Sequence, residues 1–160
     1  DKAVEAMKKK GAIGGMGDLG GNIRCFGKPP RGQAHWRVGL QDPNVSPDDM
    51  DGSKILMVLA ITDQSVATSG DYRRFVDVQG VRQSHIIDTT SGKGANKLIS
   101  DTIIAPDATT ADALSTAVNV LGPDKGLALI ERLPNVEAIL IPAGQPTHPI
   151  FSTGTKAYVE

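Results

Sequence analysis

The sequence predicts an α+β fold, in which a mixed or antiparallel sheet packs against a few helices. Short β-prone segments separated by Gly and Pro residues fill most of the first 105 residues, whereas the two clearest helical patterns follow each other in the second half. Strands and helices therefore do not alternate as they would in a parallel α/β fold. With 39% apolar residues and a net charge of −1, the 160 residues can bury the core of a single domain, 1–160.

The chain opens with a short predicted helix over residues 1–10. Ala3, Val4 and Met7 share one face of this helix, and Gly11 ends it. The glycine-dense segment that follows, 14–22, is predicted to be a loop because clustered glycines mark turns and loops.

Strands are predicted where apolar, β-branched or aromatic residues run between turn residues. The predicted strands of the first two thirds cover residues 23–26, 36–40, 54–61, 72–78, 81–87 and 101–105. Gln79 and Gly80 form a predicted hairpin turn between two of them. The small residues of segment 65–72 are predicted to form a loop between strands.

The second half contains the clearest helical signals. Its predicted elements are helices over 109–121 and 123–133 and strands over 136–141 and 152–159. Thr109 or Thr110 is expected to cap the first helix, which carries an apolar stripe along one face. Pro123 suits the start of the second helix because proline fits the first turn.

The charges and the cysteine content exclude several classes of protein. Seventeen basic and eighteen acidic residues give a sequence pI near 6.3, whereas nucleic-acid-binding domains usually lie above about 9. No apolar stretch approaches the ~18 residues of a membrane-spanning helix. Cys25 is the only cysteine, so there is no internal disulfide, and we expect it to be a small buried apolar residue.

Asp112 and Thr116 form the first candidate site. Four residues apart in a predicted helix, they place a carboxylate and a hydroxyl on one face. Both are hard oxygen ligands of the kind that Mg²⁺ prefers. The spacing also fits a structural interpretation, which it favours when taken alone: Asp112 offsets the helix dipole near the N-terminus and Thr116 is an ordinary helical residue.

Two glycine-containing loops and one histidine are weaker candidates. Small residues in segment 65–72 let backbone N–H groups approach an anion such as phosphate, and segment 17–21 is similarly open. Simple turns explain both segments about as well. His85 follows a predicted strand and precedes a polar loop, where an imidazole can act as a general base near neutral pH. A single histidine is more often structural.

The order of these segments along the chain resembles the ApbE family, the FAD:protein FMN transferases once described as thiamine-biosynthesis lipoproteins. The segments that carry the resemblance are Leu19-Gly20-Gly21-Asn22-Ile23, residues 36–43, Ala67-Thr68-Ser69-Gly70-Asp71-Tyr72, His85-Ile86-Ile87-Asp88, Ala111-Asp112-Ala113-Leu114-Ser115-Thr116-Ala117 and Val120-Leu121-Gly122. The resemblance extends from residue 1 to about residue 141, and segments 111–117, 68–72 and 85–88 are its most specific parts.

The resemblance implies a T-fold-like half of a Mg²⁺-dependent enzyme that cleaves the pyrophosphate of FAD. FMN would pass to a Thr or Ser hydroxyl of a target flavoprotein, and AMP would be released. By this resemblance Asp112 and Thr116 would bind the metal, and His85 would act as the base at the acceptor hydroxyl. The residues expected against the flavin or its phosphates are Gly20, Gly21, Ser69, Gly70 and Tyr72.

Members of the family are about twice as long as this chain, so the resemblance implies a C-terminal half that is inactive and binds FAD weakly without an N-terminal half or a second copy. It also implies a parent protein anchored by lipid on the outer side of the bacterial cytoplasmic membrane, with a cytoplasmic location as the alternative. Two other functions stay open. One is an FAD pyrophosphatase that forms FMN and AMP, and the other is a non-catalytic flavin-binding or scaffold domain.

Overall fold

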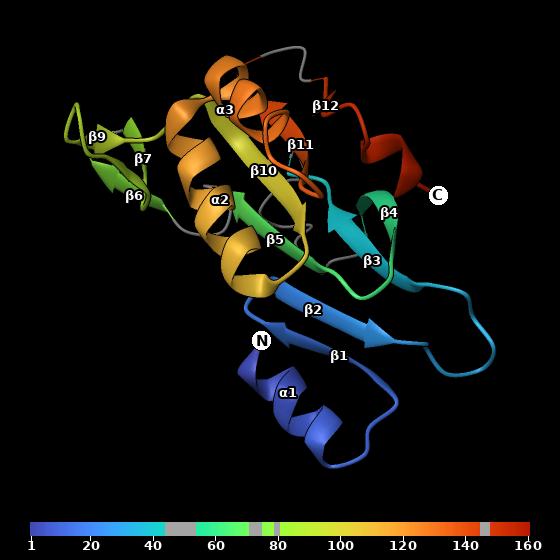
Figure 1. The fold of residues 1–160 in the computed structure, drawn as a ribbon. Coiled ribbons are helices and arrows are strands. Elements are labelled where there is room, and N and C mark those ends of the chain that lie inside the picture. The colour runs from blue at the N-terminus through green and yellow to red at the C-terminus, as the bar shows by residue number, and fades with distance from the viewer. Residues whose placement is uncertain (44–53, 71–74, 79–80, 145–147) are drawn as a thin grey trace.

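The computed structural model of the chain describes residues 1–43, 54–70, 75–78, 81–144 and 148–160 (Figure 1). Its largest sheet has the strand order β1-β2-β5-β10-β11-β12, and every neighbouring pair is antiparallel. These strands are β1 (Gly14–Leu19), β2 (Asn22–Gly27), β5 (Ser65–Gly70), β10 (Leu98–Ala105), β11 (Glu137–Pro142) and β12 (Ile150–Phe151). The predicted α+β class with an antiparallel sheet is confirmed.

Shorter strand pairs and helices complete the part of the chain that the structure describes. The pairs are β3 (Trp36–Gln41) with β4 (Ile55–Ile61), β6 (Phe75–Val78) with β7 (Val81–Ser84), and β8 (Ile87–Asp88) with β9 (Lys93–Gly94). The helices are α1 (Lys2–Lys9), α2 (Ala108–Leu121), α3 (Pro123–Ile130) and the short 3-10 helix η2 (Thr155–Ala157). Among the described residues, no helix has the length and apolar character needed to cross a bilayer.

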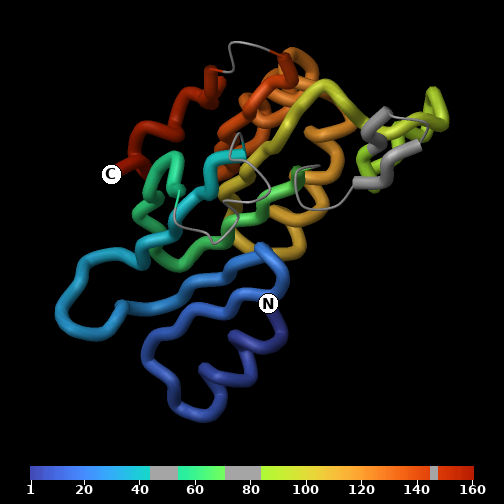
Figure 2. The backbone as a smooth tube through the Cα atoms, turned by 180° about the vertical axis from the view of Figure 1, so that it is seen from behind, coloured from blue at the N-terminus to red at the C-terminus, as the bar shows by residue number. Residues whose placement is uncertain are grey.

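The six-stranded sheet separates two apolar cores. Helices α2 and α3 cover one face, over a buried cluster that includes Ile103 and Val118 (Figure 1). The β3–β4 pair covers the other face, where Leu59 packs with Ile104. Successive residues of a strand point to opposite faces, so Ile103 and Ile104 enter different cores. Figure 2 shows β3 and β4 from behind, beside the C-terminal segment.

Two carboxylates satisfy the free N–H groups at the start of α2. Asp107 is the N-cap, and its side chain accepts a hydrogen bond from the Thr110 N–H at 2.8 Å. Asp1 accepts from the N–H groups of Ala108 and Thr109 at 2.9 and 3.0 Å. The predicted cap at Thr109 or Thr110 is therefore wrong, because the carboxylate directly before the helix takes that role.

The glycine-dense segment is a strand and a tight turn rather than the predicted loop. Strands β1 and β2 are joined by a two-residue turn at Gly20 and Gly21, whose φ angles of 68° and 97° suit a type I′ hairpin. Within β1, a Cβ on Gly15 would lie 2.6 Å from the ring of Phe26. The absence of a side chain thus allows this close approach, and pairing with β2 overrides the weak strand preference of glycine.

The predicted loop over 65–72 is also wrong, because β5 occupies most of it and lies between β2 and β10. Its small residues let α2 approach the sheet closely, as the hydroxyls of Ser69 and Ser115 lie 2.9 Å apart. The predicted strand over 152–159 is wrong as well: a 3-10 helix forms there, and a single bridge joins Val159 to Leu59.

The remaining predicted elements are confirmed within the described residues, with small changes at their ends; residues 72–74 of the predicted strand over 72–78 lie outside the described residues. Strand β7 ends at Ser84, three residues earlier than predicted, and helix α3 ends at Ile130 rather than residue 133. Cys25 is fully buried, as expected. The predicted turn at Gln79 and Gly80 lies outside the described residues.

Candidate functional site

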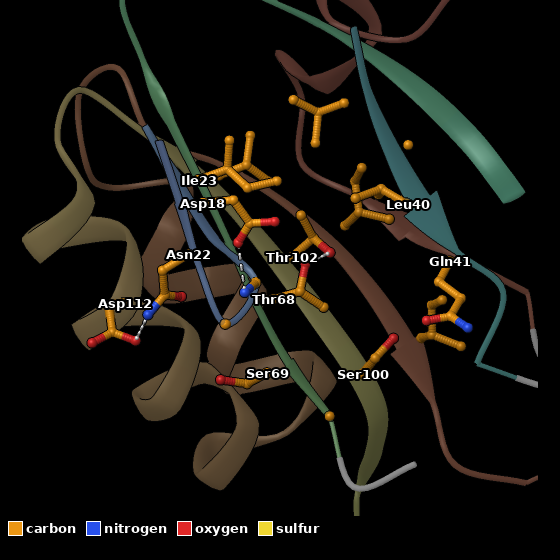
Figure 3. Close-up of a pocket in the computed structure, with 18 of the residues that line it drawn as sticks. Asp18, Asn22, Ile23, Leu40, Gln41, Thr68, Ser69, Ser100, Thr102 and Asp112 are labelled. Carbon is orange, nitrogen blue, oxygen red and sulfur yellow. Dashed lines mark hydrogen bonds between the residues drawn. The ribbon is translucent and has the colours of Figure 1, made fainter. Parts of the chain in front are cut away.

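A pocket of about 360 Å³ lies between the six-stranded sheet and the β3–β4 pair and extends to α2 (Figure 3). Its apolar lining consists of Ile23, Val38, Leu40, Leu56, Val66, Ile86, Ile139 and Ile141. Its polar lining consists of Asp18, Asn22, Gln41, Thr68, Ser69, His85, Ser100, Thr102, Asp112 and Thr116. A concave site with apolar walls and a limited set of polar groups is typical of small-molecule binding.

This pocket brings together seven of the eight site residues that the sequence singles out. They come from the β1–β2 turn, from β5, from the residue after β7 and from α2, and are Gly20, Gly21, Ser69, Gly70, His85, Asp112 and Thr116. The eighth, Tyr72, lies outside the described residues. Residues separated by up to 96 positions therefore share one cavity, while their individual roles stay predictions.

Asp112 is exposed in the second turn of α2 and faces the β1–β2 hairpin (Figure 3). Its Oδ1 accepts a hydrogen bond from Nδ2 of Asn22 at 2.9 Å. The first turn of α2 contains no acidic residue. Because a helix dipole acts mainly within the first turn, it does not account for a carboxylate at Asp112.

The backbone of Asp112 is held from a second direction. Its carbonyl oxygen accepts from the hydroxyls of Ser115 at 3.0 Å and Thr116 at 3.3 Å. Ser115 is buried and also contacts Ser69, which lines the pocket. A continuous set of hydroxyl contacts thus joins β5 to the backbone of the residue that is expected to bind a metal.

His85 is exposed at the pocket, directly after β7. The chain around it is held by its neighbours: the N–H of Ile86 donates to Oγ of Ser84 at 3.1 Å, and the carbonyl of Ile86 accepts from the Ala95 N–H at 2.8 Å. Ile86 is buried whereas His85 is exposed, in the bend between β7 and β8.

Several polar lining residues have no counterpart in the sequence-based prediction. Thr68 and Thr102 face each other across β5 and β10, with their hydroxyl oxygens 2.9 Å apart (Figure 3). Asp18 accepts from the N–H of Gly21 at 2.9 Å and braces the hairpin turn. The side-chain amide of Asn22 donates a hydrogen bond to the carboxylate of Asp112. These residues lie in or beside segments that the sequence analysis names, but no local pattern predicts their contacts, because the contacts depend on strand order and register.

The oxygen donors at this edge of the pocket match part of a Mg²⁺ site. Asp112 offers a carboxylate and Thr116 a hydroxyl on one helix face, and both line the pocket. The described residues contain no group of three or more His, Cys, Asp or Glu side chains placed to hold a metal. Since Mg²⁺ usually keeps several waters and binds through one or two carboxylates plus phosphate oxygens, this small donor set fits that ion.

The fold and the pocket define an α+β protein with a cavity between a six-stranded sheet and the β3–β4 pair. The ApbE family model matches residues 1–140, so the chain belongs to the ApbE family. A Treponema pallidum protein named FAD:protein FMN transferase is 38% identical over an alignment of 149 positions that covers 88% of this chain and 40% of that relative. A Vibrio cholerae protein of the same name is 34% identical, over 82% of this chain and 38% of its own length.

Solved structures give the same result for the fold. The ApbE protein of Thermotoga maritima superposes with a TM-score of 0.77 at 32% identity, over 92% of this chain and 45% of that one. The flavin transferase ApbE of Vibrio cholerae has a TM-score of 0.79 at 28% identity, over 99% and 48%. This chain therefore spans about 40% of the length of the curated relatives that it matches.

Proposed function

We propose that this chain supplies part of the active site of an FAD:protein FMN transferase, which moves FMN from FAD to a Thr or Ser hydroxyl of an acceptor flavoprotein and releases AMP. The observation that carries the proposal is the meeting of Asp112, Thr116, Ser69 and His85 in one pocket. Relatives that match most of this chain bear the name of that activity.

The combination of apolar and polar groups that line the pocket suits a ligand with an apolar ring and charged phosphates. The apolar walls from the sheet and from β3 and β4 would pack against a ring system. One part of the pocket, the polar end, contains the open turn at Gly20 and Gly21, where no side chain blocks the backbone, and the hydroxyl of Ser69. We assign the flavin phosphates to this polar end, together with Gly70.

Asp112 and Thr116 would hold the Mg²⁺ ion at the same end of the pocket. When bound, the ion would neutralise charge that develops on the pyrophosphate during cleavage. The chain's own contribution is placement: hydrogen bonds from Asn22, Ser115 and Thr116 fix the carboxylate and the backbone of Asp112. A carboxylate that is already fixed in this way loses less side-chain freedom when it binds the ion.

His85 is assigned as the general base. Its imidazole would take the proton of the acceptor hydroxyl while that oxygen forms a bond to the FMN phosphorus. The bond between this phosphorus and the bridging oxygen breaks, and AMP leaves with that oxygen. A hydroxyl is a weak nucleophile, so a base at the pocket edge is what the reaction needs. His85 is exposed and lines the pocket, and we place the acceptor hydroxyl beside it.

Two properties of the whole protein are proposed with this activity. The pocket would be completed by further protein, either the remainder of a family-length chain or a second copy. The natural protein would act on the outer side of the bacterial cytoplasmic membrane, anchored by lipid, and a cytoplasmic location is the alternative.

The test is FMN transfer by the complete natural protein, with FAD, Mg²⁺ and a Thr-containing acceptor flavoprotein. Flavin fluorescence on the denatured acceptor and AMP release would be measured together. We expect Asp112→Ala and His85→Ala each to lower transfer by about 100-fold or more, the range typical of lost metal or base catalysis. Asp124→Ala, at an acidic residue in the first turn of α3 and outside the pocket, is the matched control and is expected to transfer normally.

The products of the reaction distinguish FMN transfer from the two alternative functions. Free FMN and AMP in equal amounts without labelled acceptor would identify an FAD pyrophosphatase. Binding of FAD with neither product, unchanged in the Asp112 variant, would identify a non-catalytic flavin-binding domain and overturn the proposal.

A further inference from the structure

Asn22 lies in segment 19–23, which carries the family resemblance, but nothing in the sequence indicates its contact with Asp112. It is the first residue of β2, directly after the Gly20-Gly21 turn, and it lines the pocket. Its Nδ2 donates to Oδ1 of Asp112 at 2.9 Å, across 90 positions of sequence (Figure 3). This is a contact between the sheet and the exposed face of α2.

The backbone of Asn22 is fixed on both sides. It pairs with Leu19 of β1 and with Ala67 of β5. The turn before it is closed by the Asp18 side chain, which accepts from the N–H of Gly21 at 2.9 Å. The amide of Asn22 is therefore presented from a rigid strand end rather than from a mobile loop.

We propose that Asn22 is a positioning residue for divalent-cation binding at Asp112. This inference rests on the proposed function, in which Asp112 and Thr116 hold Mg²⁺. A hydrogen bond to Oδ1 restricts rotation of the carboxylate, while Oδ2 accepts no hydrogen bond from any residue that the structure describes. Asn22 thus holds one oxygen so that the other is set for the ion.

The chemistry of the amide explains why asparagine serves here. Nδ2 is a neutral donor, so it orients Asp112 without cancelling the negative charge that attracts the cation. A lysine or arginine at the same place would orient the carboxylate but would compete with the cation for its charge. Partners that orient metal-binding side chains typically change metal affinity by about 10- to 100-fold when they are removed.

The decisive experiment measures cation binding directly, without flavin. Mg²⁺ would be titrated into the complete natural protein by calorimetry, and Mn²⁺ would be followed by electron paramagnetic resonance. We expect Asn22→Leu, which keeps the approximate shape but removes the donor, to raise Kd for both ions by about tenfold. In FMN transfer, the Mg²⁺ concentration that gives the half-maximal rate should rise by the same factor.

Asn119→Leu is the matched control. Asn119 lies on the same helix, is buried, and donates to Oδ2 of Asp101 at 2.8 Å, without a contact to Asp112. Loss of this hydrogen bond should weaken the packing of α2 on the sheet, while the Kd for the cation stays within about twofold of that of the natural protein. Thermal melting of each variant would establish that it is folded, and Asn22→Ala is the second variant if Asn22→Leu does not fold.

The same cation titrations distinguish an error about Asn22 from an error about the proposed function. A Kd for the Asn22 variants within about twofold of the natural protein, or an equal loss in Asn119→Leu, would overturn the role of Asn22. Asp112→Ala serves as the reference in the same titration. If Asp112→Ala abolishes cation binding while the Asn22 variants bind cations normally, the metal site at Asp112 is supported and the inference about Asn22 is wrong. If Asp112→Ala binds cations normally, the metal assignment itself is wrong.

Discussion

Asp112 is exposed, yet its carboxylate and its backbone are both held by side chains from other positions. Asn22 contacts Oδ1, while Ser115 and Thr116 contact the carbonyl oxygen. An exposed acidic residue on a helix would ordinarily sample several rotamers. Here its environment restricts them, and a ligand that binds Asp112 loses less side-chain freedom on binding.

Gly21 provides a test of the hairpin that carries Asn22. Its φ of 97° is unfavourable for any residue with a Cβ, so Gly21→Ala should lower the free energy of unfolding by about 1–2 kcal/mol. The matched control is Gly17→Ala in β1, where φ is not positive and a Cβ meets nothing within 4 Å. Urea unfolding of both variants measures the difference, and equal effects would contradict the strained turn.

Cys25 makes stability depend on pH in the alkaline range. Burial raises the pKa of its thiol from 9.0 to about 11, although the nearby Arg24 partly opposes this shift. Above pH 9 the unfolded chain loses the proton and the folded chain keeps it, so unfolding becomes easier. Between pH 9 and 11 the free energy of unfolding should fall by about 2–3 kcal/mol more than it does in Cys25→Ala. Each unit of difference between the folded and unfolded pKa corresponds to about 1.4 kcal/mol.

Urea unfolding of the natural protein and of Cys25→Ala, at several pH values in that range, measures this effect. Parallel pH profiles for the two proteins would rule it out. The same burial predicts that the folded thiol reacts very slowly with alkylating reagents at pH 8, because thiolate is the reactive form.

At the level of single elements, α2 is the helix that organises the site, and its N-terminus is unusually well satisfied. Asp107 accepts from Thr110, while Asp1 accepts from the N–H groups of Ala108 and Thr109 and from the Thr109 hydroxyl. Hydrogen bonds from Thr110 also hold the pKa of Asp107 below its usual range. The two carboxylates thus fix the end of α2 that leads to Asp112.

Removal of either cap should therefore weaken the fold. Asp107→Ala and Asp1→Ala are each expected to lower the free energy of unfolding by about 0.5–2 kcal/mol, the usual effect of a lost N-cap. Asp124→Ala in α3 is the control, since that helix has no side-chain cap hydrogen bond. This variant should lower the free energy of unfolding by only a few tenths of a kcal/mol. Chemical unfolding checks all three, and an unchanged Asp1→Ala would show that its contacts to α2 contribute nothing.

Contact between α2 and the sheet also involves a buried acid. Asp101 on β10 is completely buried; Oδ2 accepts from Asn119, and Oδ1 has no partner among the described residues. Burial raises the pKa of this carboxyl well above its usual range. A neutral carboxyl at this point avoids the large cost of an unpaired buried charge.

On the scale of the whole molecule, the C-terminal segment closes the layer that forms one side of the pocket. The N–H of Ala60 in β4 donates to the carbonyl of Tyr158 at 2.8 Å, and the Glu160 N–H donates to Val58 at 3.1 Å. Tyr158 packs against the core between the sheet and the β3–β4 pair. The last residues thus hold β4, and through it β3, against the sheet.

Deletion of residues 155–160 should loosen this layer. Loss of the fully buried Thr155 and of the packed Tyr158 is expected to lower the free energy of unfolding by about 3 kcal/mol or more. Trp36, the single tryptophan, lies in β3 and donates from Nε1 to the carbonyl of Gly27 at 3.0 Å, so its fluorescence reports on the layer. An unshifted emission spectrum and an unchanged urea midpoint would contradict this role of the segment.

The elements that could be predicted from sequence are those with a strong local signal. Helix α2 combines an apolar stripe with polar capping residues, and β4 is a continuous apolar run. Segments 14–19 and 65–70 were predicted as loops because glycine and small residues have weak strand preferences. Their pairing with β2 and β10 is a property of the assembled sheet, which local preference does not contain.

By itself the sequence determined the fold class, the position of α2 and the presence of Asp112 and Thr116 on one of its faces, because these follow from the helical period. Only the tertiary structure decided that Asp1 caps α2 and that Asn22 contacts Asp112. Such contacts join residues far apart in the chain. They depend on strand order and register, which are set by burial summed over the whole sheet rather than by any local pattern.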